Sequence, residues 1–463
     1  MIDGLKPYPK YKDSGVPWLG EVPEHWGVLP GRALFREIND RGHPDEELLS
    51  VTISHGVVRQ ADLLSDSSKK DSSNEDKSAY KLVEPGDIAY NKMRAWQGAV
   101  GISAYRGIVS PAYIVQRLRN PRNSPQYIHY LLRTPSFTTE AERSSYGITS
   151  DQWSLRAEDF RKIYFSVPGP DEQTAIVRFL DWADHRIRRV IRAREKRIKL
   201  LEEYKQALIN QIVTGKIDVR TGKPYPKYKD SSVPWLGEVP EHWEIVRIKF
   251  IAQLKTGESI TAQHIEERGA FPVYGGNGVR GFTSSYTHEG EFVLIGRQGA
   301  LCGNINYAYD KFWASEHAVV AHPKKDIAVK WFGELLRSMN LNQYSIAAAQ
   351  PGLAIERIQN LQIPFPRLSE QNAIAKYIDE RTAKIDTAIF ATRREIELLK
   401  EFRTRLIADV VTGKLDVREV AAKLPDKAPG EKTLEGDEVE SATGDSVVSR
   451  KHVDRTQEEI NGG

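Results

Sequence analysis

Two stretches of the chain carry apolar residues at helical spacing. Between about Asp171 and Val213, and between about Ser369 and Val411, isoleucine, leucine and valine recur at steps of three, four and seven. Neither stretch contains proline or glycine, and each runs into Thr-Gly, where glycine favours a left-handed helix cap. The narrow seam predicts two long helices of coiled-coil type, each roughly 60 Å long at about 1.5 Å per residue. A helix with one apolar stripe needs a partner, and each helix is the expected partner of the other.

Three cations interrupt this seam. Arg194, Lys205 and Arg403 fall on positions that are otherwise apolar. A charge at a seam position either weakens a helix pair or fixes its register. Both outcomes stay open at the level of sequence.

A different pattern fills residues 27–165 and 244–363, called here the first and second modules. Short apolar or alternating runs, separated by glycine and proline, predict strands, and apolar patches near 124–133 and 327–339 predict helices. The fold class expected is therefore α/β (α+β), with two mixed modules and two long helices. The polar stretch Ser65–Ser78 is expected to be an exposed loop.

The chain also repeats a frame around these modules. The opening blocks, residues 6–26 and 223–243, differ only at Gly15 and Ser232, and the closing blocks read VTGKIDVR at 213–220 and VTGKLDVR at 411–418. The two modules between these blocks are almost unrelated in sequence. The repeat therefore predicts a recognition protein that carries two different recognition surfaces on the same scaffold geometry. The opening blocks carry tryptophans that are expected to anchor the frame: Trp18, Trp26, Trp235 and Trp243.

The repeat predicts how the chain divides. A closing block precedes the second opening block and another ends the second half, so the folded ends are expected to lie close together. The domains expected are 1–165 (first module with its opening block), 166–220 (central helix and closing turn), 221–363 (second module with its opening block), 364–418 (distal helix and closing turn) and 419–463 (disordered tail).

Composition limits the class of protein. A chain of 463 residues is too long for one core. Its net charge is +3, and because residues 419–463 hold 6 Lys/Arg and 11 Asp/Glu (−5), the remainder carries about +8. That mild basic excess is compatible with nucleic acid. There is no N-terminal apolar leader pattern and no 18-residue apolar run, and the lone Cys302 excludes an internal disulfide, so a cytoplasmic protein is expected.

Catalytic and cofactor motifs are missing from the sequence. There is no G-x-x-x-x-G-K-[ST] loop, no strand-linked G-x-G-x-x-G, no Pro-Pro dipeptide of an adenine methyltransferase loop, and no metal-binding histidine spacing. The glycine-rich residues 275–278 precede no helix and predict a tight turn. We therefore expect a non-catalytic chain without a metal or a cofactor of its own.

Two loop clusters carry the candidate recognition chemistry. Residues 91–99 and 296–300 each follow a Gly-acidic pair and an apolar run, and each places Arg and Gln beside Gly. Arg can pair with guanine and Gln with adenine in the major groove, while Gly lets the backbone approach a phosphate. The alternative is a plain strand–turn–strand element, but recurrence in both halves supports recognition. The candidate DNA-binding residues are Lys92, Arg94, Gln97, Tyr146, Thr149, Asn277, Arg280, Tyr286, Arg297 and Gln298.

These residues carry a family resemblance. The opening block from Asp13 to Trp26 and its copy resemble the specificity subunit of type I restriction–modification enzymes. So do the Glu-Gln motifs at 172–176 and 370–374, the closing blocks, and the inserts at 90–94 with 109–113 and at 272–278 with 296–300. The resemblance covers residues 6 to about 418.

The resemblance implies two target-recognition domains separated by two antiparallel helices. It implies a non-catalytic subunit that binds double-stranded DNA and recruits two methyltransferase subunits and then restriction subunits. S-adenosylmethionine, ATP and Mg²⁺ would then be bound by those partners.

The expected mechanism is that each module reads one half of an asymmetric, bipartite site while the helix pair sets the spacer. Two alternatives remain. A repeat-built scaffold could bind proteins through its inserts without reading DNA, and a self-sufficient nuclease or methyltransferase would conflict with the missing motifs.

Overall fold

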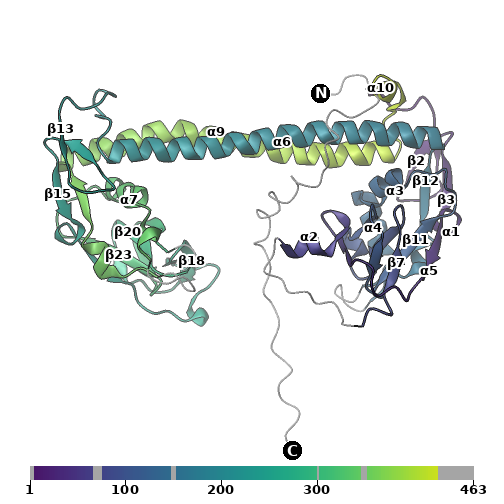
Figure 1. Cartoon of the computed structure of the whole chain (residues 1–463), viewed down its shortest axis with the longest axis horizontal. Coiled ribbons are helices and arrows are strands. Elements are labelled where there is room, and N and C mark those ends of the chain that lie inside the picture. The colour runs from purple at the N-terminus through teal and green to yellow at the C-terminus, as the bar shows by residue number, and fades with distance from the viewer. Residues whose placement is uncertain (1–4, 66–75, 148–152, 300–301, 346–351, 426–463) are drawn as a thin grey trace, which may run out of the picture. The chain divides into compact units, whose positions relative to one another are not determined.

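The computed structural model describes residues 5–65, 76–147, 153–299, 302–345 and 352–425. The chain forms two compact units, Met1–Ile191 with Glu397–Gly463 (unit 1) and Arg192–Ile396 (unit 2). The two predicted long helices are confirmed as α6 (Pro170–Val213) and α9 (Leu368–Val411), each of 44 residues. Figure 1 shows α6 and α9 side by side, and each helix contributes one part to each unit.

The two helices are antiparallel within each unit. In unit 1, Ile187 of α6 shares a core with Leu406 near the end of α9. In unit 2, the later part of α6 contacts the earlier part of α9, where Ile385 and Ile389 are buried. The apolar seam predicted from sequence is therefore the surface along which the helices pack.

The seam cations pair across the helices. Lys205 Nζ lies 2.6 Å from Asp386 Oδ1 in unit 2. In the same unit Arg194 is paired with Glu395, and in unit 1 Arg403 is paired with Asp184. Each cation faces a carboxylate on the opposite helix at a defined position, so the seam charges fix the register of the pair.

The first module, in unit 1, is built on an antiparallel four-stranded sheet of order β4-β11-β8-β9. These strands are β4 (Phe35–Ile38), β11 (Tyr113–Leu118), β8 (Ile88–Asn91) and β9 (Val100–Ile102). The other paired strands of unit 1 are β1 (Tyr11–Asp13) with β2 (Glu21–Pro23), β3 (Gly27–Pro30) with β12 (Tyr164–Val167), β5 (Leu49–Thr52) with β6 (Gly56–Arg59), and β7 (Lys81–Val83) with β10 (Gly107–Val109).

Short helices complete unit 1. They are α1 (Gly31–Leu34), α2 (Gln60–Ser65), α3 (Pro125–Leu132), α4 (Pro135–Arg143), α5 (Ala157–Phe160) and α10 (Arg418–Ala422). Ser124 and Thr134 begin α3 and α4 because their side chains accept hydrogen bonds from backbone N–H groups of the first turn, and each is followed by proline at the first helical position. The helix predicted near 124–133 is confirmed. Most of the predicted polar loop Ser65–Ser78, residues 66–75, lies outside the described residues.

The second module, in unit 2, contains two four-stranded sheets. One has the order β16-β23-β20-β21, with β16 (Ala252–Thr256), β23 (Ala318–Pro323), β20 (Phe292–Gly296) and β21 (Ile305–Ala308). The other has the order β18-β17-β22-β19, with β18 (Gly278–Thr283), β17 (Phe271–Gly275), β22 (Lys311–Ala314) and β19 (His288–Glu289). The remaining elements include β13 (Tyr228–Asp230) with β14 (Glu238–Pro240), β15 (Glu244–Arg247) with β24 (Gln362–Phe365), α7 (Val329–Ser338) and α8 (Ile355–Gln359). The mixed α/β fold class and the helix near 327–339 are confirmed.

The first turn of each long helix joins the opening block to the module. Glu172 accepts a hydrogen bond of 2.7 Å from the Tyr8 hydroxyl and lies 2.8 Å from His25 Nε2. The next residue, the buried Gln173, accepts 2.7 Å from the backbone N–H of Ser124. Unit 2 repeats these contacts with Glu370, Tyr225, His242, Gln371 and Ala328.

Each closing block packs against an opening block through a glycine. Gly413 and Gly215 have positive φ, and a Cβ on either would lie within 2.6 Å of proline Cδ: Pro23 at 2.4 Å and Pro240 at 2.5 Å. Trp26 and Trp243, beside those prolines, are fully buried, as expected of anchors. Because Gly413 belongs to the last closing block and Pro23 to the first opening block, the two ends of the folded chain meet in unit 1.

A backbone bridge closes this arrangement. The N–H of Asp416 donates to the carbonyl of Lys6 at 2.7 Å, and Asp218 makes the equivalent bond to Lys223 at 2.8 Å. The predicted proximity of the folded ends is confirmed. Residues 419–422, which were expected to belong to a disordered tail, instead belong to α10, where Ala421 is buried; residues 426–463 lie outside the described residues.

Replacing the closing-block glycines tests this packing. Gly413→Ala and Gly215→Ala should each lower the free energy of unfolding by roughly 2–4 kcal/mol, because a left-handed alanine costs about 1–2 kcal/mol and displacing the proline and tryptophan costs about as much again. Gly20→Ala and Gly237→Ala are matched controls, since both glycines have positive φ but nothing within 4 Å of an added Cβ. Chemical denaturation of the full chain measures the difference. Equal losses in all four variants would contradict the packing argument.

Candidate nucleic-acid interface

The first loop cluster (residues 91–99) is a compact loop between the paired strands β8 and β9. The side chain of Asn91 accepts from the N–H of Met93 at 3.0 Å, and a turn of 3-10 helix, η1 (Ala95–Gln97), follows. Ala95 is buried under the loop, whereas Arg94 and Gln97 are exposed. The buried Ala95 anchors the loop on the module. Arg94 and Gln97, the two polar side chains predicted to contact DNA, are exposed to solvent.

A group of cations surrounds Tyr113 at the base of this loop. Lys81 donates to the backbone carbonyl of Tyr113 at 2.7 Å. Burial lowers the pKa of Lys81, and the nearby cations Arg41 and Lys92 act in the same direction, against Glu37. Such a concentration of positive charge favours a phosphate or another anion. Lys81 and Arg41 were not among the sequence candidates, because only the fold brings them to Lys92.

Arg94 lies in the same neighbourhood. Burial raises the pKa of the Tyr113 hydroxyl, while the Arg94 guanidinium and a hydrogen bond with Asn91 act against that shift. The guanidinium of Arg94 is thus close enough to Tyr113 to interact with it electrostatically. Arg41 and Arg94 are exposed and Lys92 is half-buried, whereas Lys81 lies buried beneath the surface with 5% exposure.

The structure also brings Tyr146 to this loop through a segment that the sequence did not indicate. The carbonyl of Lys92 accepts from the N–H of Leu155 at 2.8 Å, and Ser154 forms an antiparallel bridge with the exposed Tyr146. Trp153 packs edge-on against Trp96 of the loop, with ring centroids 5.2 Å apart. Thr149 lies outside the described residues.

In unit 2, the tip of the hairpin β17–β18 forms the predicted tight turn. Gly275 pairs with Gly278, which has φ +96°, so Gly276 and Asn277 are the two residues at the tip. Asn277 is exposed, and Arg280 folds its aliphatic part over Gly275, where a Cβ would lie 2.4 Å from Arg280 Cδ. The turn therefore presents two of the predicted polar side chains together.

The described part of the second loop cluster, residues 296–299, lies beneath this tip. A Cβ on Gly276 would be 3.6 Å from the carbonyl of Gln298, so the turn rests on the loop that follows β20. Backbone bonds hold the loop in place: Arg297 N–H donates to the carbonyl of His317, and the Arg297 carbonyl accepts from Leu353, both at 2.9 Å. The candidates Asn277, Arg297 and Gln298, separated by about twenty residues in the sequence, thus share one surface.

Tyr286 does not join this group. Its ring packs against Phe271, at the opposite end of β17 from Asn277, with centroids 5.1 Å apart, and Lys311 Nζ lies 4.8 Å from the Tyr286 centroid. The structure instead adds two neighbours of the hairpin tip that the sequence analysis missed, Asn304 and His317. Neither has a distinctive sequence signal, because both are single polar residues near strand ends.

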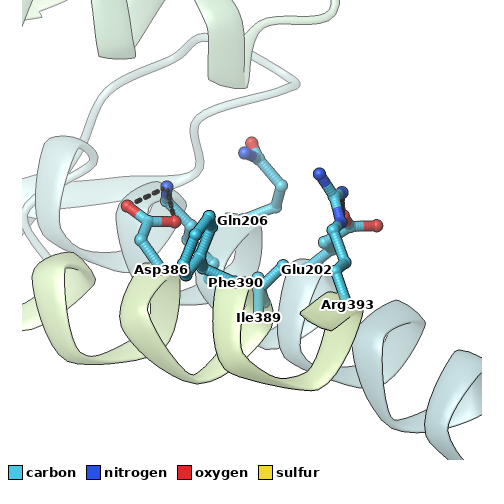
Figure 2. A pocket seen from close by; sticks show the side chains of 7 residues that line it. Glu202, Gln206, Asp386, Ile389, Phe390 and Arg393 are labelled. Atoms are coloured by element: carbon cyan, nitrogen blue, oxygen red, sulfur yellow. Dashed lines mark hydrogen bonds and ion pairs between the residues drawn. The ribbon is translucent and has the colours of Figure 1, made fainter. Parts of the chain in front are cut away.

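A second kind of surface lies on the helix pair. In unit 2, a hollow of about 440 Å³ is lined by charged and polar residues and by Phe390, whose side chain is 74% exposed. Figure 2 shows Gln206, Phe390 and Arg393 projecting from the same side of the pair, with Arg393 bonded to Glu202 at 2.9 Å. An aromatic side chain this exposed on a rigid helix is a candidate contact for a protein partner.

Apolar residues are also exposed at repeat-related positions of the helices. Leu200 and Tyr204 of α6, in unit 2, are 55% and 59% exposed, and Leu398 and Phe402 of α9, in unit 1, are 48% and 41% exposed. Each pair is spaced i, i+4 and so lies on one helix face. An exposed leucine with an aromatic residue four positions later therefore occurs once in each unit.

Among the described residues, no group of three or more His, Cys, Asp or Glu side chains could hold a metal ion. Within the same ranges, no helix combines the length and apolar character needed to cross a bilayer.

The chain is similar to proteins of type I restriction–modification systems. Residues 240–398 match the family model of the type I restriction modification DNA specificity domain. The type I restriction enzyme EcoprrI specificity subunit of Escherichia coli is 42% identical over 134 residues, which are 28% of this chain and 33% of that protein. The match thus spans about a third of that relative's length.

Longer matches are more distant. The putative type I restriction enzyme MjaX specificity subunit of Methanocaldococcus jannaschii is 22% identical over 437 residues, or 86% of this chain and 96% of that protein. A chain in a solved structure concerned with complex assembly and conformational transition of the type I R-M system superposes with a TM-score of 0.62 at 16% identity, covering 84% of this chain and 98% of that one. That likeness extends the shared fold over most of the chain.

Proposed function

We propose that this chain, which belongs to the family of type I restriction–modification specificity subunits, selects the DNA sequence on which a restriction–modification complex acts. The observation that carries the proposal is the combination of a duplicated frame with two unlike modules. Both units hold their module by the same glutamine contact, yet the two modules differ in sequence and in the arrangement of their exposed loops. Two different recognition modules, each held by the same repeated frame, suit an asymmetric DNA site with two half-sites.

The proposed reading elements are the two surfaces described above. In unit 1, Arg94 and Gln97 would contact base edges while Lys92 supplies positive charge for phosphates. In unit 2, the hairpin tip and Gln298 would do the same for the other half-site. Lys92, Tyr146, Thr149, Arg280, Tyr286 and Arg297 remain proposed DNA contacts.

The subunit is a recognition component without catalysis of its own. It would work in the cytoplasm within a complex whose methyltransferase and restriction subunits bind S-adenosylmethionine, ATP and Mg²⁺. The rival function is a protein scaffold that does not read DNA. DNA affinity of the assembled complex that falls steeply with salt, together with a large ratio of specific to nonspecific affinity, would favour sequence-specific DNA recognition over the scaffold.

Exchanging the second module tests the division of labour. Replacing residues 244–363 with the insert of a different family member should change one half-site and leave the other half-site and the spacer unaltered. Mapping methylated adenines in DNA from cells that carry the variant with its partners measures all three. A change in both half-sites would contradict independent reading, and no change in either would remove DNA reading from the second module.

The helix pair is proposed to set the spacer. Inserting seven residues into both α6 and α9 at repeat-related positions keeps the seam in phase and adds about 10 Å of helix. At about 3.4 Å per base pair, the unread spacer should lengthen by up to about three base pairs while both half-sites stay the same. The same methylation map reports the result. An unchanged spacer would contradict the proposal that the length of the helix pair sets the spacer.

The repeated exposed pairs are proposed to bind two copies of the methyltransferase subunit. Leu200→Ala with Tyr204→Ala should remove one bound copy, and adding Leu398→Ala with Phe402→Ala should remove the other, since each buried anchor at an interface contributes about 1–2 kcal/mol or more. Native mass spectrometry of the complex counts the subunits. Phe250→Ala, an exposed aromatic of the second module, is the control and should leave two copies. Two copies bound at unchanged affinity in the fourfold variant would contradict the assignment.

A further inference from the structure

A pair of amide side chains joins the hairpin tip of unit 2 to the residue that precedes β21. Asn304 Nδ2 donates to Asn277 Oδ1 at 2.8 Å. The backbone of Asn304 is fixed separately, because its carbonyl accepts from the N–H of Gly296 at 2.8 Å immediately before β21 begins. The donor is therefore anchored on the sheet, and the acceptor is anchored on a two-residue turn.

The turn itself leaves Asn277 little freedom. Gly278 has φ +96°, and a Cβ there would lie 3.3 Å from Asn306 Oδ1, so the hairpin approaches β21 closely at this point. A Cβ on Gly276 would lie 3.3 Å from the carbonyl of His317. With the backbone confined on both sides, the orientation of the Asn277 amide depends on its own side-chain torsions and on Asn304.

This contact divides the hydrogen-bonding capacity of Asn277. An asparagine amide offers one oxygen with two lone pairs and an NH₂ group with two donors. Here Asn304 occupies one lone pair of the oxygen, so the NH₂ group holds the larger share of the remaining hydrogen-bonding capacity. Bidentate pairing with adenine would use the oxygen for N6–H₂ and the NH₂ group for N7, and the bond from Asn304 competes for that oxygen.

We propose that Asn304 is a positioning residue that holds Asn277 as a hydrogen-bond donor toward DNA. One position of the half-site read by unit 2 is then a base with a major-groove acceptor, which is guanine (N7 and O6), thymine (O4) or adenine (N7). Cytosine presents only its N4 amino group in the major groove, so two donors would face each other. The inference rests on the proposed function, because it specifies what one residue of the reading surface recognises.

The substitution Asn304→Asp tests the orientation. A carboxylate only accepts hydrogen bonds, so it would bind the NH₂ group of Asn277 and turn the amide oxygen outward. Cytosine, which the native orientation disfavours, should then be accepted at that base pair, with its relative affinity raised by about tenfold or more. Asn304→Ala frees the amide and should relax the preference without reversing it. Binding of the assembled complex to DNA randomised within the half-site read by unit 2 measures both.

Controls separate this effect from charge and from folding. Asn360→Asp adds the same charge elsewhere in unit 2, at a side chain that accepts from Lys249 at 2.8 Å, and should leave base preference unchanged. The other half-site serves as an internal reference, and the melting temperature of each variant shows that it folds. A merely structural role for Asn304 would lower affinity evenly across all bases, and that result would overturn the inference.

The two substitutions together distinguish failure of the positioning role of Asn304 from failure of DNA recognition by the second module. If exchanging residues 244–363 changes a half-site but Asn304→Asp changes no base preference, only the positioning role fails. If neither alters base preference, DNA reading by the second module fails with it.

Discussion

The first turn of each long helix is the joint on which the rest of the structure depends. Two adjacent residues, Glu172 and Gln173, face different parts of the chain: the carboxylate takes hydrogen bonds from the opening block, and the buried amide bonds to the module at Ser124. A buried amide without its partner would cost about 1–3 kcal/mol, so the module is held in one orientation relative to its own part of the helix. The second half repeats the tyrosine, histidine and backbone N–H contacts of this joint.

The chemistry of this joint explains how the inserts can differ while the frame does not. In both units the module contributes a backbone N–H to the glutamine, from Ser124 in one and from Ala328 in the other. A backbone donor is present whatever the side chain, proline excepted. The module sequence is therefore free to diverge without loss of the joint. The frame keeps its side chains because there the contacts are specific: a glycine closing turn against proline and tryptophan tolerates almost no substitution.

Sequence reasoning succeeded where the signal was periodic and failed where it depended on distant contacts. The apolar seam predicted the starts of α6 and α9 to within one residue. An apolar stripe at helical spacing over 44 residues is compatible with a long helix and not with strands or loops. It could not decide between the two roles of the seam cations, since Lys205 and Asp386 are 181 residues apart. The tight turn at Gly278 was predictable from local chemistry. The neighbours Asn304 and Lys81 were not, because each is an isolated polar residue that gains its role only when the sheet brings it to a loop.

Magnitude decides what a contact such as that between Asn277 and Asn304 can do. An exposed amide–amide hydrogen bond contributes about 0.5–1.5 kcal/mol, which is too little to determine a fold whose modules rest on large buried cores. The two orientations of an asparagine amide, however, fill the same volume and differ mainly in hydrogen bonding. A difference of about 1.4 kcal/mol then populates one orientation tenfold over the other. A bond that hardly affects stability can thus control which edge of a base is accepted, and recognition can change while the supporting fold stays the same.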